Sequence, residues 1–599
     1  MSWRELNISP QKQLFILLIL ALGLNINTVF NEYVLDDAIV LTENTVIQKG
    51  IKGIPEILST DLYYGCRELT AKLSEPRYRP FSLVIFALEY QLFGKNAFVS
   101  HSINVLLFAL LIGLLFQLLR KYIFKEQHPY LAFICCLLFV AHPIHTEVIA
   151  NVKSRDELIT FTLLILSTST FIKYLDKSTI PNLVISIICF FLALLTRESA
   201  VAFLAILPLI LFLFFNRTIK QALLLSVPWL TTTAIYLVLR HYILANDPQL
   251  SDNSFDVFNS PFLLASSSEA FATKFYILLK YILLLFFPHP LSWDYGFQQI
   301  HYIDITSIQF ILSFVVVFSL LIFALFTLRK KTVVSFSILY FFATISLVSN
   351  FVVDVGTPLS ERFLFQPSLA VCILLAVYYF KFLEKNKFIV NTFLITILIL
   401  FSVKTVMRNT IWKDNDILMI TDVNSAPDSF RTNKFAAGAY LNKANNETNQ
   451  KIKIEYYQQA AGYGEYALKM IGHEPALEID LGNIYLGLSD YSRSAKYFED
   501  AYKTDPSNPE TKKRLILLSD IFYNEGNKQY RNNEINKAID SYKRSVELNN
   551  VNLDAWYNLG GCYFKVNDTK NAIEAWQVVK QLSPDHQFNR EAFSEHGSD

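Results

Sequence analysis

A succession of apolar blocks occupies the first two thirds of the 599-residue chain and limits its fold more than any other feature. A helix that crosses a bilayer needs about 20 mostly apolar residues. Eleven segments approach or meet that length, whereas Phe81–Phe93 and Phe275–Phe287 are shorter and fit re-entrant or interfacial helices. The predicted spans are Leu14–Asn31, Phe98–Leu119, Leu131–Ile149, Leu158–Tyr174, Leu183–Thr196, Ala200–Phe215, Ala222–Tyr242, Ile308–Leu328, Val333–Val353, Phe363–Phe382 and Phe388–Val406.

The first apolar run is expected to be a retained helix rather than a cleaved signal peptide. No small-x-small cleavage site precedes the acidic stretch that follows it, and further spans come later in the chain.

Composition divides the chain into two main parts. Apolar residues make up 52% of it, but they thin out near Arg408, beyond which Lys, Glu, Asn and Tyr dominate. We therefore predict a membrane domain at 1–407 with an external loop at 32–79, a linker at 408–430, a second domain at 431–588 and a polar tail at 589–599. A net charge of +1 without a basic arm disfavours a nucleic-acid partner. The six cysteines mostly lie in apolar blocks, which indicates packing rather than disulfides or a metal site.

Short loops rich in Lys and Arg lie on the cytoplasmic side of membrane proteins. With eleven spans and an inside N-terminus, every basic cluster falls on that side, so the loop 32–79 and the C-terminal domain lie on the other. The clusters are Arg120, Lys121 and Lys125; Lys173 and Lys177; Arg217 and Lys220; Arg329, Lys330 and Lys331; and Lys381, Lys385 and Lys387.

The C-terminal domain contains internal repeats. Gly526 and Gly560, and likewise Ala538 and Ala572, are separated by the tetratricopeptide period of about 34 residues. The last unit carries the pattern Trp556, Leu559, Gly560, Tyr563, Ala572, Trp576 and Pro584, and an earlier unit carries Leu481, Gly482, Tyr485, Phe498, Ala501 and Pro506.

A ten-residue phase slip between these units predicts a lengthened helix at Lys512–Tyr523, and a degenerate unit is expected at Arg431–His473. Stacked helical hairpins leave a concave surface suited to an extended peptide. The whole chain is therefore predicted to be all-α, with a polytopic membrane domain followed by a repeat solenoid.

The acidic pair Asp36 and Asp37 follows the end of the first span at Phe30. Adjacent carboxylates at a membrane boundary repel each other, which raises the pKa of at least one, and such pairs are often functional. The competing interpretation is an N-cap for a following interfacial helix. The residues alone leave both readings open.

A second polar run contains His142, His145 and Glu147 and continues to Arg155 and Asp156. Because the first two are separated by a proline-containing His-x-x-His spacing, their imidazoles do not share one helical face cleanly, so no metal is expected. The alternative is that these polar side chains satisfy one another between helices.

Two charged pairs, Arg197-Glu198 and Glu361-Arg362, lie at external span ends, and Arg79 precedes another apolar stretch. Ion pairs of this kind hold helices together, but the planar guanidinium also suits a phosphate. Carboxylates and arginines from four loops therefore meet at one membrane face. That arrangement suits removal of a sugar from a lipid phosphate, with a carboxylate as base and cations on the leaving group.

The ordered set of motifs resembles the transmembrane and tetratricopeptide-repeat O-mannosyltransferases, which are type C membrane glycosyltransferases related to the protein O-mannosyltransferases. The resemblance extends from about residue 14 to residue 585. The motifs are Asp36-Asp37-Ala-Ile39, Tyr78-Arg-Pro-Phe-Ser82, Phe93-Gly94, His101-Ser-Ile-Asn104, His142-Pro-Ile-His-Thr-Glu147, Ser154-Arg-Asp156, Arg197-Glu198 and Ser360-Glu-Arg-Phe-Leu364.

The resemblance implies inverting transfer of mannose or a similar hexose from a polyprenyl or dolichyl phosphate to Ser or Thr, without metal or cofactor. Asp36 and Asp37 would supply the catalytic base, and Arg155, Arg197 and Arg362 become candidates for the donor phosphate. The wider substrate-binding set adds Arg79, His142, His145, Glu147, Asp156, Glu198 and Glu361.

The chain departs from animal members of that family in its short repeat array and compact loops. We therefore expect a bacterial inner-membrane protein whose active site and repeats face the periplasm. Its expected partners are a polyprenyl-phosphate sugar, an acceptor protein or peptide bound through the repeats, and membrane lipid.

Two alternatives remain. One is a non-enzymatic membrane anchor whose repeats assemble envelope proteins, which leaves the charged span ends unexplained. The other is a transferase that acts on a lipid or glycan acceptor. A transporter is disfavoured because the charges lie near one face rather than at mid-membrane.

Overall fold

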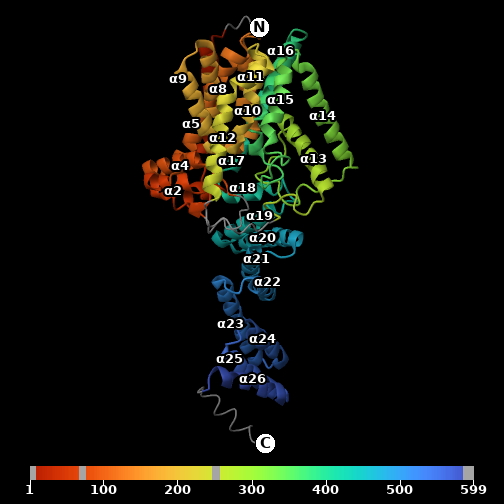
Figure 1. Ribbon diagram of the computed structural model, residues 1–599. Helices are drawn as coiled ribbons and strands as arrows, with labels where there is room; N and C mark the ends of the chain where they lie inside the picture. The colour runs from red at the N-terminus through yellow and green to blue at the C-terminus, as the bar shows by residue number, and fades with distance from the viewer. Residues whose placement is uncertain (1–7, 67–75, 246–256, 585–599) are drawn as a thin grey trace. The chain divides into compact units, whose positions relative to one another are not determined.

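The computed structural model of the protein describes residues 8–66, 76–245 and 257–584 (Figure 1). Within these ranges the regular structure is helical and no strand forms. The chain divides into two compact units, Met1–Thr432 and Asn433–Asp599. The prediction of an all-α fold is confirmed.

Five helices of the first unit are long and apolar enough to cross a membrane. They are α1 with its continuation η1 (Pro10–Phe30), α5 with η5 (Ala97–Ile123), α8 (Arg155–Lys177), α14 (Ile308–Leu328) and α17 (Lys387–Ile411).

Two bent pairs raise the number to as many as seven crossings. Helix α6 (Leu131–Ala141) meets the segment Pro143–Ala150, formed by η6 and α7, at 56°, and α11 (Ile219–Leu225) meets α12 (Val227–Ala245) at 47°. A proline stands just after each break, where its missing N–H and its ring prevent a straight helix from continuing.

Shorter apolar helices account for the other predicted spans. They are α9 (Ile180–Thr196), η7 with α10 (Glu198–Phe214), α15 (Val333–Ser346) and α16 (Ser368–Leu383), whereas α4 (Pro80–Phe93) is a further short apolar helix outside the eleven. Each of the eleven predicted segments contains helix, but these four helices are shorter than a straight crossing requires. The count of eleven crossings stays a prediction.

The two short apolar stretches are also helical. Phe81–Phe93 lies in α4, and Phe275–Phe287 lies almost entirely in α13 (Ser267–Phe286), which a serine capping box begins. The remaining elements of the first unit are η2 (Ala38–Thr42), η3 (Ile47–Gly53), α2 (Ile54–Ser59), η4 (Tyr64–Cys66), η8 (Glu361–Leu364) and α18 (Asn415–Asp422).

The helices of the first unit form a bundle with two distinct ends. Figure 1 shows α2, α4 and α18 at the end opposite to α11 and the labelled end of α16. At the latter end the turns that carry two of the basic clusters meet, since Lys331 Nζ donates a hydrogen bond to Asn216 Oδ1 at 3.0 Å. The acidic pair belongs to the end that contains α2 and α4, because η2 contacts α4 directly.

The segment 408–430, expected as a linker, is packed into the first unit. Arg408 forms a buried two-pronged ion pair with Asp422, and Trp412 is fully buried. A bidentate guanidinium–carboxylate pair fixes both geometry and position. The boundary between the two compact units therefore lies at 432–433. The composition break near Arg408 does not mark it, because these polar residues make buried contacts that composition does not reveal.

The second unit is a stack of helical hairpins. The paired helices are α19 (Phe430–Asn446) with α20 (Gln450–Ile471), α21 (Pro475–Gly487) with α22 (Tyr491–Thr504), α23 (Pro509–Arg531) with α24 (Ile535–Leu548), and α25 (Leu553–Lys565) with α26 (Thr569–Leu582). The first hairpin coincides with the predicted degenerate repeat. Helix α23, with 23 residues, is nearly three turns longer than α25, with 13 residues, as the phase slip predicts.

Glycines permit close approach of the helices within these hairpins. A Cβ added to Gly526 would lie 2.8 Å from the Tyr542 ring, and one added to Gly560 would overlap the Trp576 indole. Neither aromatic side chain has room to retreat without opening the hairpin, since both rings are buried.

Replacement of Gly560 by valine is expected to destabilise the last repeat by about 2 kcal/mol through overpacking. Gly561 provides a matched control, because a Cβ there meets nothing within 4 Å. Hydrogen exchange of the full-length protein should show lost protection in α25 and α26 for Gly560→Val and not for Gly561→Val. Equal protection in both variants would contradict the close-approach account.

Candidate functional site

The two adjacent aspartates occupy different environments. Asp37 is fully buried and accepts two backbone N–H groups, from Val34 to Oδ2 at 2.9 Å and from Lys153 to Oδ1 at 2.7 Å. The side chain of Asp36 is 39% exposed, and its Oδ2 lies 3.6 Å from both Lys153 Nζ and Arg362 Nη1. Asp37 thus connects its own loop to the loop that contains Lys153, and Asp36 is the accessible carboxylate.

Contacts with α5 and α18 hold the loop that carries this pair. The Glu32 N–H donates to the Lys413 carbonyl at 2.8 Å, and the Leu35 N–H donates to Asn415 Oδ1 at 2.9 Å. His101 Nε2 lies 3.1 Å from the Glu32 carbonyl oxygen. Leu35 itself has a φ of 49°, a left-handed conformation that costs free energy and persists only where its surroundings impose it.

The surroundings separate the pKa values of the two aspartates. Burial raises the pKa of Asp37 to about 7, against the two backbone N–H donors that favour its charged form. Burial also opposes ionisation of Asp36, but the Lys153 ammonium and the Arg362 guanidinium outweigh it and hold the pKa of Asp36 below its usual value. At neutral pH Asp36 is therefore an ionised and accessible proton acceptor.

Lys153 also titrates away from its usual range. Burial lowers the pKa of its ammonium to about 8, although the Asp36 carboxylate opposes that shift. The charge on Lys153 is therefore present at neutral pH and is lost in mildly alkaline solution.

Arg362 joins the acidic pair to a second carboxylate. Its backbone N–H donates to Glu147 Oε2 at 2.9 Å, and its Nη1 lies 3.3 Å from Glu147 Oε1 and 3.6 Å from Asp36. The neighbouring Glu361 points elsewhere, because its Oε1 accepts from the Tyr295 hydroxyl at 2.8 Å and from the Ser292 N–H.

Another group of predicted site residues forms a closed ion-pair network. Asp156 Oδ2 lies 2.9 Å from Arg79 Nη1 and 3.0 Å from Arg197 Nη1. Arg79 also pairs with Glu198 at 2.9 Å, and Arg197 pairs with Glu157 at 3.0 Å. Both guanidinium groups are buried and committed to carboxylates from other helices, so their contacts are those of helix-joining residues.

Arg155 is likewise enclosed by protein groups. It forms an ion pair with Glu89 of α4, its Nε donates to Asn104 Oδ1 at 2.6 Å, and its Nη2 donates to the Ser100 carbonyl at 2.9 Å. The guanidinium also lies over the Phe86 ring, 4.6 Å from the centroid. The side chain is fully buried and joins α8 to α4 and α5.

The two histidines bond to neighbouring helices. His142 Nδ1 accepts the Ile144 N–H at 3.2 Å while Nε2 lies 2.9 Å from the Leu285 carbonyl oxygen, and His145 Nε2 lies 2.8 Å from Ser368 Oγ. Within the described ranges no three His, Cys, Asp or Glu side chains converge as a metal site.

The predicted residues therefore fall into two sets. In the first set, Arg362 contacts both Glu147 and the accessible carboxylate of Asp36, and Asp37 holds the same loop. The other predicted site residues join helices or bond to neighbouring protein groups. Lys153 completes the first set and was not predicted as a site residue. Its position two residues before Arg155, in the charged stretch Lys153-Ser-Arg-Asp-Glu157, is the available signal, but sequence spacing does not show that its side chain turns toward Asp36.

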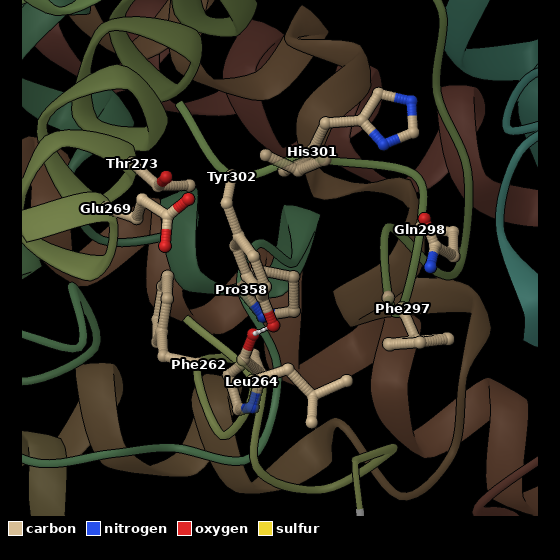
Figure 2. A pocket seen from close by; sticks show the side chains of 12 residues that line it. Phe262, Leu264, Glu269, Thr273, Phe297, Gln298, His301, Tyr302 and Pro358 are labelled. Atoms are coloured by element: carbon tan, nitrogen blue, oxygen red, sulfur yellow. Dashed lines mark hydrogen bonds between the residues drawn. The ribbon is translucent and has the colours of Figure 1, made fainter. Parts of the chain in front are cut away.

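A separate cavity of about 300 Å³ lies among the loops around α13, lined by Phe262, Leu264, Glu269, Thr273, Phe297, Gln298, His301, Tyr302 and Pro358 among others (Figure 2). Its one carboxylate, Glu269, is engaged in the capping box of α13. The Tyr302 hydroxyl donates to the Pro261 carbonyl at 2.8 Å. This cavity contains none of the predicted site residues, and we place no reacting group in it.

Replacement of Arg155 by glutamine is expected to lower stability rather than to weaken a ligand contact. It leaves the Glu89 carboxylate buried and unpaired, which costs about 3–5 kcal/mol. Thermal unfolding of the purified protein should show a clear loss for Arg155→Gln and little change for Arg120→Gln, at a half-buried position in η5. Similar melting temperatures for the two variants would contradict the structural role.

The fold and the site define a polytopic membrane protein with a carboxylate–cation cluster at one end of its helices and a tetratricopeptide-repeat domain after it. The model of dolichyl-phosphate-mannose-protein mannosyltransferases matches residues 74–243, and tetratricopeptide-repeat models match 479–508 and 523–586. The chain is thus similar to these enzymes, and the predicted resemblance to O-mannosyltransferases with repeats is confirmed.

Curated relatives agree with this resemblance. The chain is 26% identical to the human protein O-mannosyl-transferase TMTC1 over 72% of its own length and 52% of that protein. It is 24% identical to the protein O-mannosyl-transferase F38B6.6 of Caenorhabditis elegans, over 69% of the chain and 58% of that protein. With human TMTC3 the identity is 22%, over 94% and 67% respectively. The chain therefore spans about half to two thirds of the length of these relatives.

Among solved structures, the repeat protein YrrB overlaps 36% of the chain and 97% of its own length at 19% identity, with a TM-score of 0.17. That similarity is too low to add to the description of the fold.

Proposed function

We propose that the protein is a membrane glycosyltransferase that moves mannose or a similar hexose from a polyprenyl-phosphate donor to Ser or Thr of envelope proteins. The observation that carries the proposal is the accessible, ionised Asp36 between the cations of Lys153 and Arg362. The similarity to protein O-mannosyltransferases supports the same reaction class.

The proposed step is a single displacement at the anomeric carbon. The acceptor hydroxyl oxygen forms the new bond to that carbon, its proton passes to the Asp36 carboxylate, and the bond from carbon to phosphate oxygen breaks with the electron pair leaving on the phosphate. Because the acceptor hydroxyl attacks from the face opposite to the departing phosphate, this single displacement inverts the anomeric configuration. The step needs no metal, because fixed cations can stabilise the charge that develops on the departing phosphate.

The neighbouring residues position the base and the cations beside it. Asp37 holds the loop of the base against the Lys153 backbone, and Glu147 holds Arg362. Because a misplaced reacting group loses much of its effect, these positioning contacts matter for rate as well as for stability. The repeats offer a concave surface suited to an extended acceptor segment.

We place this reaction on the periplasmic side of a bacterial inner membrane. The positive-inside rule supports that side, since the turns that carry two of the basic clusters lie at the end of the bundle away from Asp36.

Replacement of Asp36 by asparagine is expected to reduce sugar transfer to a protein acceptor by about 10²–10⁴-fold, the usual contribution of a general base. The abundance and melting temperature should stay normal, because the side chain is half-exposed. Mass spectrometry of envelope proteins from cells that express each variant measures the product. The exposed Asp304→Asn serves as the matched control, and unchanged transfer by Asp36→Asn would contradict the proposal.

Transfer is expected to fall above about pH 8, since Lys153 then loses the positive charge that faces Asp36. Arg362 and Arg79 lower and Asp156 raises the pKa of the same ammonium. Lys153→Arg should retain its charge and shift the alkaline fall to higher pH. Initial rates measured between pH 6 and pH 10, a range of about two units on either side of that pKa, test this. A fall in the transfer rate at the same pH in wild type and in Lys153→Arg would contradict the role of Lys153.

A further inference from the structure

Lys404 is a cation within the membrane-spanning part of α17. Asn409 on the same helix is level with the end of α1, because its side chain donates to the Leu24 carbonyl at 2.9 Å. At 1.5 Å per residue, Lys404 lies about 7 Å deeper along the helix axis. A charge at such a depth is costly and is retained where it meets a functional partner.

The side chain of Lys404 meets a second basic group. Its Nζ lies 2.8 Å from His289 Nδ1, in the turn that follows α13. An ammonium only donates, so Nδ1 accepts and the ring carries its proton on Nε2. The pair therefore offers the remaining Lys404 N–H groups and the His289 Nε2–H as donors.

Lys404 has no carboxylate partner within 4.0 Å in the part of the chain that the structure describes. The charged groups that act on it are Arg408 and Glu361. Arg408 is paired with Asp422 through Nη1 and Nη2, and Glu361 accepts from Tyr295 through Oε1. This differs from the arginines of the closed ion-pair network, each of which is paired with buried carboxylates.

The surface around Lys404 is apolar and exposed. Leu400 and Met407 lie one turn before and after it on the same helix face, and Phe287 precedes His289. These side chains are among the exposed large apolar residues of the first unit. The Lys404–His289 pair is therefore a donor group within a surface suited to lipid chains.

The donor group also lies close to the site that contains Asp36. The Tyr295 hydroxyl lies 3.2 Å from the carbonyl oxygen of Pro290, which follows His289, and 2.8 Å from Glu361 Oε1. Glu361 directly precedes Arg362, whose Nη1 lies 3.6 Å from Asp36 Oδ2. An anion held at Lys404 would thus be next to the elements that present the base.

We propose that Lys404 and His289 bind the phosphate monoester that the polyprenyl carrier bears once the sugar has left, with the isoprenoid chain against the exposed apolar face of α17 and the end of α13. This inference rests on the proposed function. It assigns the carrier phosphate to groups other than Arg79, Arg155 and Arg197, whose guanidinium donors are already committed to protein carboxylates.

Native mass spectrometry of the full-length protein in detergent tests the inference with undecaprenyl monophosphate, neutral undecaprenol and phosphatidylglycerol as probes. Wild type is expected to prefer the monophosphate over undecaprenol. Lys404→Met should weaken monophosphate binding by about tenfold or more, as loss of a charge-assisted contact does. Lys404→Arg should retain it, and His289→Gln should weaken it to a smaller extent.

The matched control is Lys385→Met, at the predicted cytoplasmic end of α16, which should bind as wild type does. Unchanged monophosphate binding by Lys404→Met would overturn the inference, as would an equal loss of phosphatidylglycerol, which would indicate a general headgroup site. If Lys404→Met does not purify as a folded protein, His289→Gln decides, and wild-type binding by that variant overturns the inference.

The two proposals fail separately. Asp36→Asn should bind the monophosphate normally while losing transfer. Normal binding by Lys404→Met removes the carrier site and leaves Asp36 as the base, whereas normal transfer by Asp36→Asn removes Asp36 as the base and leaves the phosphate site.

Discussion

The bond between the Asp37 carboxylate and the Lys153 backbone N–H determines how the two halves of the site meet. It joins the loop after the first span to the loop before α8, which are more than 100 residues apart in sequence. Because Asp37 also accepts the Val34 N–H, its carboxylate closes the turn that places Asp36 outward. One buried acid is therefore needed to present the other.

The buried charged residues at this end of the bundle are paired with groups of opposite charge. A buried ion that lacks a partner costs several kcal/mol, so each deep guanidinium is matched by carboxylates from another helix. Arg79 and Arg155 fasten α8 to its neighbours through Asp156 and Glu89. Arg362 differs because it is partly exposed and divides its contacts between Glu147 and Asp36. That incomplete enclosure leaves a cation available beside the base.

Much of the fold could be predicted from the sequence because both of its patterns are local. Apolar length gives the helices, and the spacing of Gly560 and Trp576 gives the hairpins. The packing of 408–430 could not be predicted, since Arg408 and Asp422 look like ordinary surface residues until their burial is known. The difference between Asp36 and Asp37 was equally hidden, because adjacent residues of one type carry no sequence signal of which one is buried.

A cryo-EM structure of the Asp36→Asn variant with a polyprenyl-phosphate hexose and an acceptor peptide tests the account most directly. The account predicts the acceptor hydroxyl within about 3.2 Å of the side chain at position 36, the reach of a general base. It also predicts the anomeric carbon beyond that hydroxyl, on the side of Lys153 and Arg362. A hydroxyl that instead contacts Glu147, or that lies away from both carboxylates, would contradict it.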